Sequence, residues 1–309
     1  MLNSFSATNN IFLRIRFVLL SLSFIGLGHI SAANEATLDT TNDVISSEPE
    51  WHTDYMDAYR LARREKKMLL INFLCESCQD DQQELEQYIK ADESLQSKLQ
   101  HMVLLQVKVD SEIEVDAKKE KLLTQAAFRE MHGKPGIAII DLKHEGQPYY
   151  GNVVSAFPFT TGKYYDWCAE NFPAVVDLPA GTITQRTMVW AVRIHPEKPA
   201  STSGQCDPLL TTAATSHSNS QARTQVQGHQ GWSGRYQQIC SSIAVNDAKE
   251  VVAESWPNQT MIDSCIDCVA SWRYSSGHWG AVRSRHRLFG YDIKRGRNGI
   301  WYGTGIFAN

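Results

Sequence analysis

Short apolar runs alternate with longer segments of helical periodicity through the first half of the chain. The runs are long enough for buried strands and too short for helices to be preferred. The strands predicted from them are Met68–Phe73, Met102–Val109, Ile137–Asp141 and Tyr149–Val154. The segments with apolar residues three or four positions apart predict helices over Trp51–Lys67, around Leu85–Ile89, over Ala117–Met131 and over Thr161–Phe172. This order predicts an α/β domain over residues 51–177.

The second half of the chain has a different pattern. Thr187–Ile194 reads as a strand, and Pro196–Gly204 is a loop rich in Pro, Ser and Gly. Helices are predicted at Leu210–His217 and around Cys265 and Cys268. A hairpin is predicted at the end, because alternating apolar residues precede Asn298-Gly299, a dipeptide typical of two-residue turns. We therefore expect residues 178–206 to be a linker with a strand, followed by a second domain over residues 207–309.

The N-terminal segment predicts export. Arg14 and Arg16 precede the apolar stretch Phe17–Leu27, and the small residues Ser31-Ala32-Ala33 follow it. This arrangement is typical of a signal peptide over residues 1–33, although an uncleaved anchor is the alternative. Residues 34–50 are polar and predict a disordered lead-in. We expect a secreted or periplasmic protein with no membrane span in the mature chain.

Composition adds two constraints. The chain has 309 residues and a formal net charge of −4, which predicts two globular domains and gives no case for nucleic-acid binding. It has seven cysteines, an odd number, so at least one is free, intermolecular or engaged in exchange. An exported location permits disulfides.

Cys75 and Cys78 form a Cys-x-x-Cys pair between a predicted strand and a predicted helix. At the start of a helix, free backbone N–H groups and the helix dipole stabilise a thiolate at the first sulfur. The second sulfur, one turn later, can resolve a mixed disulfide. A permanent structural disulfide is the alternative. A zinc site is disfavoured, because the next pair, Cys265 and Cys268, is far away in the sequence.

Residues 51–172 resemble the thioredoxin superfamily. The motifs that carry the resemblance are Cys75-Glu76-Ser77-Cys78 and Lys134-Pro135-Gly136. The resemblance implies a thioredoxin-like fold in which Cys75 is the nucleophile and Cys78 the resolving thiol. It also implies that Pro135, preceded by a cis peptide bond, shapes the groove for substrate. The implied partners are exported proteins that carry thiols or disulfides.

Residues 207–309 resemble the CAP superfamily, the secreted SCP-like extracellular domains. Three motifs carry this resemblance: His229 with Gly231 and Arg235, then Ala253-Glu254-Ser255, and then Trp272 with Ser275, Gly277 and His278. The resemblance implies an α/β/α sandwich. It also implies that His229, Glu254 and His278 line one cleft, where some members of the family bind divalent metal.

Three roles are open for these residues. Two imidazoles and a carboxylate leave one open position on a tetrahedral zinc ion. Without metal, the same groups could perform acid–base chemistry, or the histidines could simply make core hydrogen bonds. We therefore expect thiol–disulfide exchange coupled to a CAP-like domain that binds metal or another ligand. The alternative is a non-catalytic binding protein, extracellular or in the cell envelope, with a structural thioredoxin-like scaffold.

Overall fold

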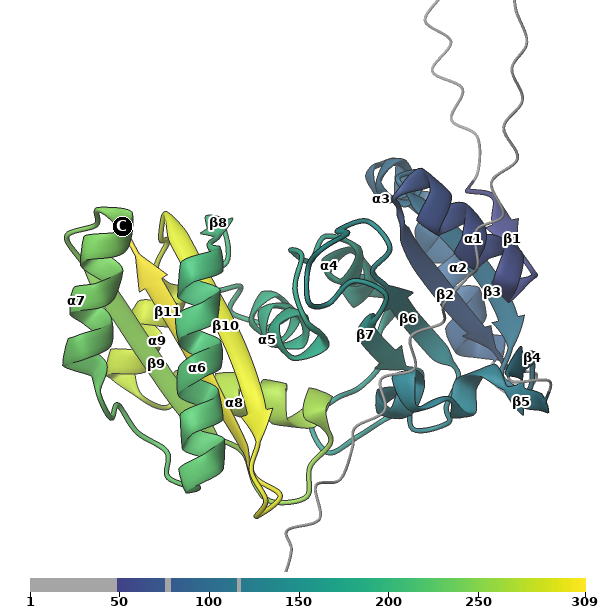
Figure 1. Cartoon of the computed structure of the whole chain (residues 1–309). Helices are drawn as coiled ribbons and strands as arrows, with labels where there is room; N and C mark the ends of the chain where they lie inside the picture. The colour runs from purple at the N-terminus through teal and green to yellow at the C-terminus, as the bar shows by residue number, and fades with distance from the viewer. Residues whose placement is uncertain (1–48, 76–78, 116–117) are drawn as a thin grey trace, which may run out of the picture. The chain divides into compact units, whose positions relative to one another are not determined.

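The computed structural model describes residues 49–75, 79–115 and 118–309, which fall within one compact unit. It contains a five-stranded sheet with the order β1-β3-β2-β6-β7 and a four-stranded sheet with the order β8-β10-β11-β9 (Figure 1). Helices pack against both sheets, so the predicted α/β class is confirmed. The predicted signal segment lies outside the described residues, and the division into domains stays a prediction.

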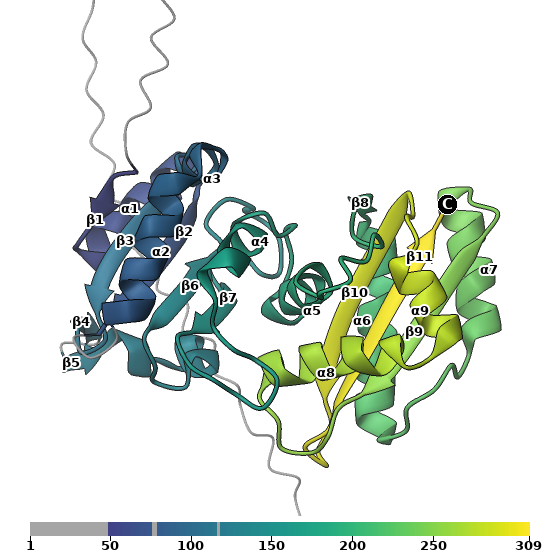
Figure 2. The same ribbon diagram turned by 180° about the vertical axis from the view of Figure 1, so that it is seen from behind.

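The five-stranded sheet is built on the apolar runs of the first half. Its strands are β1 (Trp51–His52), β2 (Met68–Leu74), β3 (Met102–Lys108), β6 (Gly136–Ile140) and β7 (Val153–Pro158). The first three are mutually parallel, and β6 is antiparallel to both β2 and β7. Successive side chains of a strand point to opposite faces. Leu69 and Ile71 therefore pack beneath α1 (Tyr55–Glu65), while Leu70 packs beneath α2 (Gln79–Ala91) and α3 (Glu93–Leu99) (Figure 2).

The helix predicted over Ala117–Met131 is wrong. The chain there forms a hairpin of β4 (Glu112–Val115) and β5 (Lys118–Lys121), followed by the 3-10 turns η1 (Leu122–Thr124) and η2 (Ala126–Met131). In an α-helix Ala127 would share one face with Leu123 and Met131, but Ala127 is exposed. The buried residues are Leu122, Leu123, Phe128 and Met131, whose spacing does not fit one face of an α-helix.

The helix predicted over Thr161–Phe172 is also absent. This segment contains a bridge between Thr161 and Asp166 and the short turn η3 (Ala169–Asn171), and α4 (Phe172–Val176) begins where the helix should end. The fourth strand lies at β7 rather than at Tyr149–Val154. The Asp263 carboxylate, distant in sequence, accepts the backbone N–H groups of Tyr164 and Tyr165. This tertiary contact overrides the local periodicity.

The strand predicted over Thr187–Ile194 is wrong, because this segment belongs to helix α5 (Ile183–Arg193). The helix begins with a capping box, in which the Thr182 hydroxyl accepts the N–H of Gln185 and the Gln185 side chain accepts the N–H of Thr182. Every residue from Arg186 to Val192 is buried. A helix buried all round shows no polar face, so its periodicity is hidden in the sequence.

The second sheet contains β8 (Gln205–Cys206), β9 (Ala248–Glu254), β10 (Leu288–Arg295) and β11 (Trp301–Ala308). The two views place α6 (Pro208–Thr224) and α7 (Trp232–Ile243) on one face, and α8 (Met261–Arg273) and α9 (Ser276–Arg283) on the other (Figures 1 and 2). The predicted hairpin is confirmed as β10 and β11, and α6 and α8 confirm two predicted helices. None of the described helices is long and apolar enough to cross a membrane.

Candidate functional site

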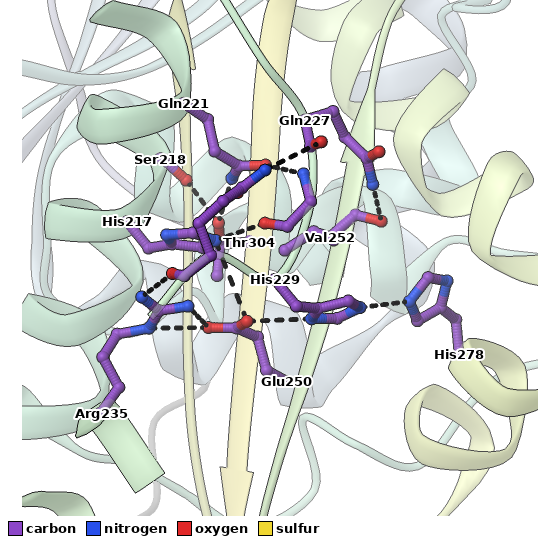
Figure 3. A network of polar contacts seen from close by, with 12 residues as sticks. His217, Ser218, Gln221, Gln227, His229, Arg235, Glu250, Val252, His278 and Thr304 are labelled. Carbon is purple, nitrogen blue, oxygen red and sulfur yellow. Dashed lines mark hydrogen bonds and ion pairs between the residues drawn. The ribbon is translucent and has the colours of Figure 1, made fainter. Parts of the chain in front are cut away.

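Two of the three predicted metal ligands meet in the structure. His229 lies in the loop before α7, and His278 lies in the first turns of α9. Their Nε2 atoms are 3.2 Å apart, and the ring edges that carry these nitrogens point toward one another (Figure 3). His229 is exposed and His278 is half-buried, so solvent reaches the pair.

A buried carboxylate that the motifs did not indicate orients His229. Glu250, in β9, has a fully buried side chain, and its Oε1 lies 2.9 Å from Nδ1 of His229. Arg235 donates to the other oxygen, Oε2, from Nη2 at 2.6 Å and from Nε at 2.9 Å (Figure 3). A buried carboxylate requires such compensation by charge and hydrogen bonds. The sequence contained one signal for Glu250: it precedes Glu254 by four residues, an even number, and such residues of a strand lie on the same face.

Glu254 does not join the histidines. It is exposed at the end of β9, four residues beyond Glu250, which corresponds to about 13 Å along a strand. Within the described ranges, no group of three or more His, Cys, Asp or Glu side chains is arranged to hold a metal ion. The set of His229, Glu254 and His278 is therefore not assembled, and the histidine pair remains.

The loop that carries His229 is held on both sides. On one side, the carbonyl oxygen of Gly228 is 2.8 Å from Nε2 of the buried His217, and the N–H of Gly228 donates to Oε1 of Gln221. On the other side, Arg235 donates from Nη1 to the carbonyl oxygen of Gln230. These contacts come from α6 and α7, so two helices fix the position of the ring.

The partners of the rings determine their protonation. Because the Glu250 carboxylate accepts at Nδ1 of His229, the proton of a neutral ring lies on Nδ1 and its Nε2 carries a lone pair. Burial and the neighbouring His229 lower the pKa of His278. With the lone pair of His229 on Nε2, the contact between the two Nε2 atoms is a hydrogen bond that the Nε2–H of His278 donates. A metal ion bound to both rings would replace this proton.

The thiol site is described in part. Cys75 directly follows β2, and α2 begins at Gln79, whereas Cys78 lies outside the described residues. Phe73 pairs with Gly136, so the buried Pro135 lies one residue beyond this pair, at the same end of the strands as Cys75. The described residues contain no cis peptide bond, so the cis bond expected before Pro135 is absent.

Three cysteines of the second half, Cys206, Cys265 and Cys268, are poor candidates for thiolate chemistry. Cys265 and Cys268 are fully buried in α8, and burial raises the pKa of both thiols. Burial also raises the pKa of Cys206. A thiol whose pKa is raised carries little thiolate at neutral pH and is a weak nucleophile.

The histidine pair and its buried carboxylate are therefore the features on which a function can be proposed. Comparison with models of protein families and with curated protein sequences found no match for the chain.

Proposed function

We propose that this protein binds a divalent transition-metal ion through His229 and His278, with zinc as the ion to test first. The single observation that carries the proposal is the separation of 3.2 Å between the two Nε2 atoms. Zinc–imidazole bonds are about 2.0–2.1 Å long, and tetrahedral geometry then places two ligand nitrogens roughly 3.3 Å apart. The pair therefore fits one ion with little movement.

The surroundings of His229 support this proposal. Metal-binding histidines commonly donate their second ring N–H to a carboxylate, which fixes the tautomer and increases the basicity of the ligand. Glu250 is placed to do so, and Arg235 holds Glu250 in turn. Glu250 would orient a ligand rather than bind the metal itself.

Two protein ligands leave two positions on a tetrahedral ion. Water, or an oxygen or nitrogen atom of a bound molecule, would occupy them. A zinc ion bound there would polarise such a molecule as a Lewis acid. The protein's contribution is two imidazole Nε2 atoms held at a fixed spacing in a place that solvent can reach, where the ion would replace the proton between them.

The N-terminal segment supports the proposal that this site works outside the cytoplasm, in a secreted or periplasmic protein. An extracellular ligand of the metal-bearing site is then the proposed partner, in keeping with the resemblance of residues 207–309 to the CAP superfamily.

The test is zinc binding measured by calorimetry, with thermal melts at neutral pH. We expect zinc to raise the melting temperature, and the gain to fade as pH falls through about 6.5, because protons compete for imidazole. His229→Ala combined with His278→Ala should abolish the gain. Alanine at the exposed His101 and His132 is the matched control. Equal melting curves in zinc and in chelator would exclude the metal site.

A second proposal is thiol–disulfide exchange through Cys75 and Cys78, with exported proteins that contain thiols or disulfides as partners. The observation in its favour is the position of Cys75 between β2 and α2, at the strand ends near Pro135. A Cys78→Ala variant should then trap mixed disulfides through Cys75, whereas Cys240→Ala should not. If nothing is trapped, the first half of the chain acts as a scaffold.

A further inference from the structure

A cavity of about 230 Å³ lies beside the five-stranded sheet, far in sequence from the histidine pair. Its walls come from β1, β2, β3 and α2, which contribute Trp51, Asn72, Gln106, and the pair Leu85 and Ile89. The cavity is larger than the 150 Å³ or so that suffices for benzene in a protein core.

A buried asparagine forms part of the cavity wall. Asn72 lies in β2, two residues after Leu70, so both side chains point to the face that α2 covers. Asn72 pairs in register with Gln106 of β3, which places two amides side by side on an otherwise apolar face. An asparagine within an apolar run of a central strand needs an explanation.

The Asn72 side chain has an unmet hydrogen-bonding capacity. Asn72 is only 1% exposed, and within the described part of the chain no protein donor reaches its Oδ1. A buried acceptor without a partner destabilises a protein, and such groups are rare. The amide of Gln96, which also faces this cavity, is different, because its Nε2 already donates to the carbonyl oxygens of Ile89 and Lys90.

The rest of the wall is suited to an apolar ring. Leu85 and Ile89 are buried on α2, and the half-buried Trp51 belongs to the same apolar cluster. The charged residues of the lining are Glu86 and Lys90, and both are exposed. No buried charge lies in the described wall to compensate a charged ligand, so an ionised molecule would lose solvation without replacement.

We propose that this cavity binds a neutral, ring-sized molecule that carries one N–H or O–H donor. The donor satisfies Oδ1 of Asn72, and the ring packs between Trp51 and the apolar face of α2. This inference is independent of the metal site, since it uses none of the same residues.

Indole and indene provide the test, because they have the same shape and only indole carries a ring N–H. Affinities are measured by calorimetry on the purified protein, and the site is located from the NMR signals of the Asn72 amide and the Trp51 indole. We expect indole to bind about threefold to tenfold more tightly than indene, as for one hydrogen bond to a buried acceptor. This comparison needs no variant.

The Asn72→Leu variant then removes the acceptor and keeps a side chain of similar size. Its indole preference should disappear, whereas Asn246→Leu at an exposed position should keep it. If Asn72→Leu does not fold, Ile89→Phe provides a second variant, which should fill the cavity and weaken both ligands. The proposal is overturned if neither ligand binds the wild type, if indene binds as tightly as indole, or if the preference survives in Asn72→Leu.

Discussion

Nδ1 of His229 lies 2.9 Å from Oε1 of Glu250, a carboxylate whose side chain is fully buried. The exposed ring of His229 is thus oriented by the carboxylate of Glu250, which solvent does not reach. Arg235 donates twice to the same carboxylate and has a side chain that is 18% exposed. The orientation of His229 therefore depends on an ion pair inside the protein.

Glu250→Gln should lower the free energy of unfolding by about 3 kcal/mol. The substitution leaves Arg235 without its anionic partner, and breaking one side of a buried ion pair destabilises strongly. Urea denaturation measures the change. Glu254→Gln, at an exposed position of the same strand, should stay within about 0.5 kcal/mol of the wild type. Equal effects of the two substitutions would contradict the assigned role of Glu250.

If zinc binds, Glu250→Gln should also weaken its affinity by about tenfold while leaving the two histidines in place. Loss of a carboxylate that orients a ligand typically has an effect of this size. Calorimetry at neutral pH tests this expectation, because the variant need only remain folded at the temperature of the titration. An unchanged zinc affinity would show that Glu250 has a structural role alone.

His286 should make stability depend on pH. Burial lowers the pKa of His286, while Nε2 contacts the carbonyl oxygen of Ala281 and the ring stacks on Phe307. Lys249 and Asp247 also act on the ring. Because the pKa is lower in the folded state, the unfolded chain binds more protons below about pH 6.5. The contribution of neutral His286 is present above that pH and is lost as pH falls.

The destabilisation caused by His286→Gln should therefore shrink as pH falls from about 7.5 to about 5. An NMR titration of the wild type should place the pKa of His286 below 6.5 or so. His132→Gln, at an exposed position, serves as the control for the loss of an imidazole. A destabilisation by His286→Gln that grows at low pH would contradict the sign of the shift.

Gly136→Ala should prevent folding or cost more than about 3 kcal/mol. The backbone there has a φ of 139°, and an added Cβ would lie 2.3 Å from the carbonyl oxygen of Phe157. Gly133→Ala is the matched control, because its φ is 69° and no atom lies within 4 Å of the added Cβ. It should cost about 1 kcal/mol from backbone strain alone. Similar melting temperatures for the two variants would contradict this packing.

Arg186→Leu should destabilise the protein by about 3 kcal/mol or more. The buried Arg186 donates to the hydroxyl of Ser155 and to the carbonyl oxygens of Leu178 and Pro179. Burial lowers its pKa to about 10, so the guanidinium remains charged at neutral pH. The leucine would leave three acceptors without this donor, two of them buried and the third, the carbonyl oxygen of Pro179, partly buried. Arg60→Leu on the exposed surface of α1 is the control.

The same variant tests the predicted boundary near Leu178. Arg186 in α5 bonds to Ser155 in β7, so it links the two segments that the prediction separates. If they are separate domains, Arg186→Leu should make their unfolding transitions diverge when tryptophan fluorescence is compared with circular dichroism. A single coincident transition in the variant would favour one cooperative unit.

Elements whose formation depends on one dominant physical effect were predictable from the local sequence. Strands β2 and β3 were predictable because they are apolar runs of strand length, and the final hairpin was predictable from Asn298-Gly299. The hairpin loop is longer than the two residues that this dipeptide favours, because the last pair of the ladder is Arg295 with Trp301, and of the dipeptide only Gly299 has a positive φ, 78°. These elements depend on local backbone preference and on burial alone.

Other features depend on contacts that the sequence does not reveal. The all-round burial of α5 comes from elements on every side of it, although the spacing of Thr182 and Gln185 was a readable capping signal. Glu250 was missed because the motif pointed to Glu254, and only the register of the sheet shows which carboxylate lies beneath His229. The unmet acceptor of Asn72 likewise becomes visible only once α2 covers it.

The position of β9 within its sheet has a consequence for the order of folding. In the described sheet β9 pairs with β11, and helices α8 and α9 lie between these strands in the sequence. Because the ribosome makes a chain from its N-terminus, β9 is synthesised well before β11, the strand that pairs with it. Non-local pairing of this kind folds slowly. Glu250 would therefore be enclosed late, so an ion added to nascent protein should reach its full affinity only after β11 has emerged.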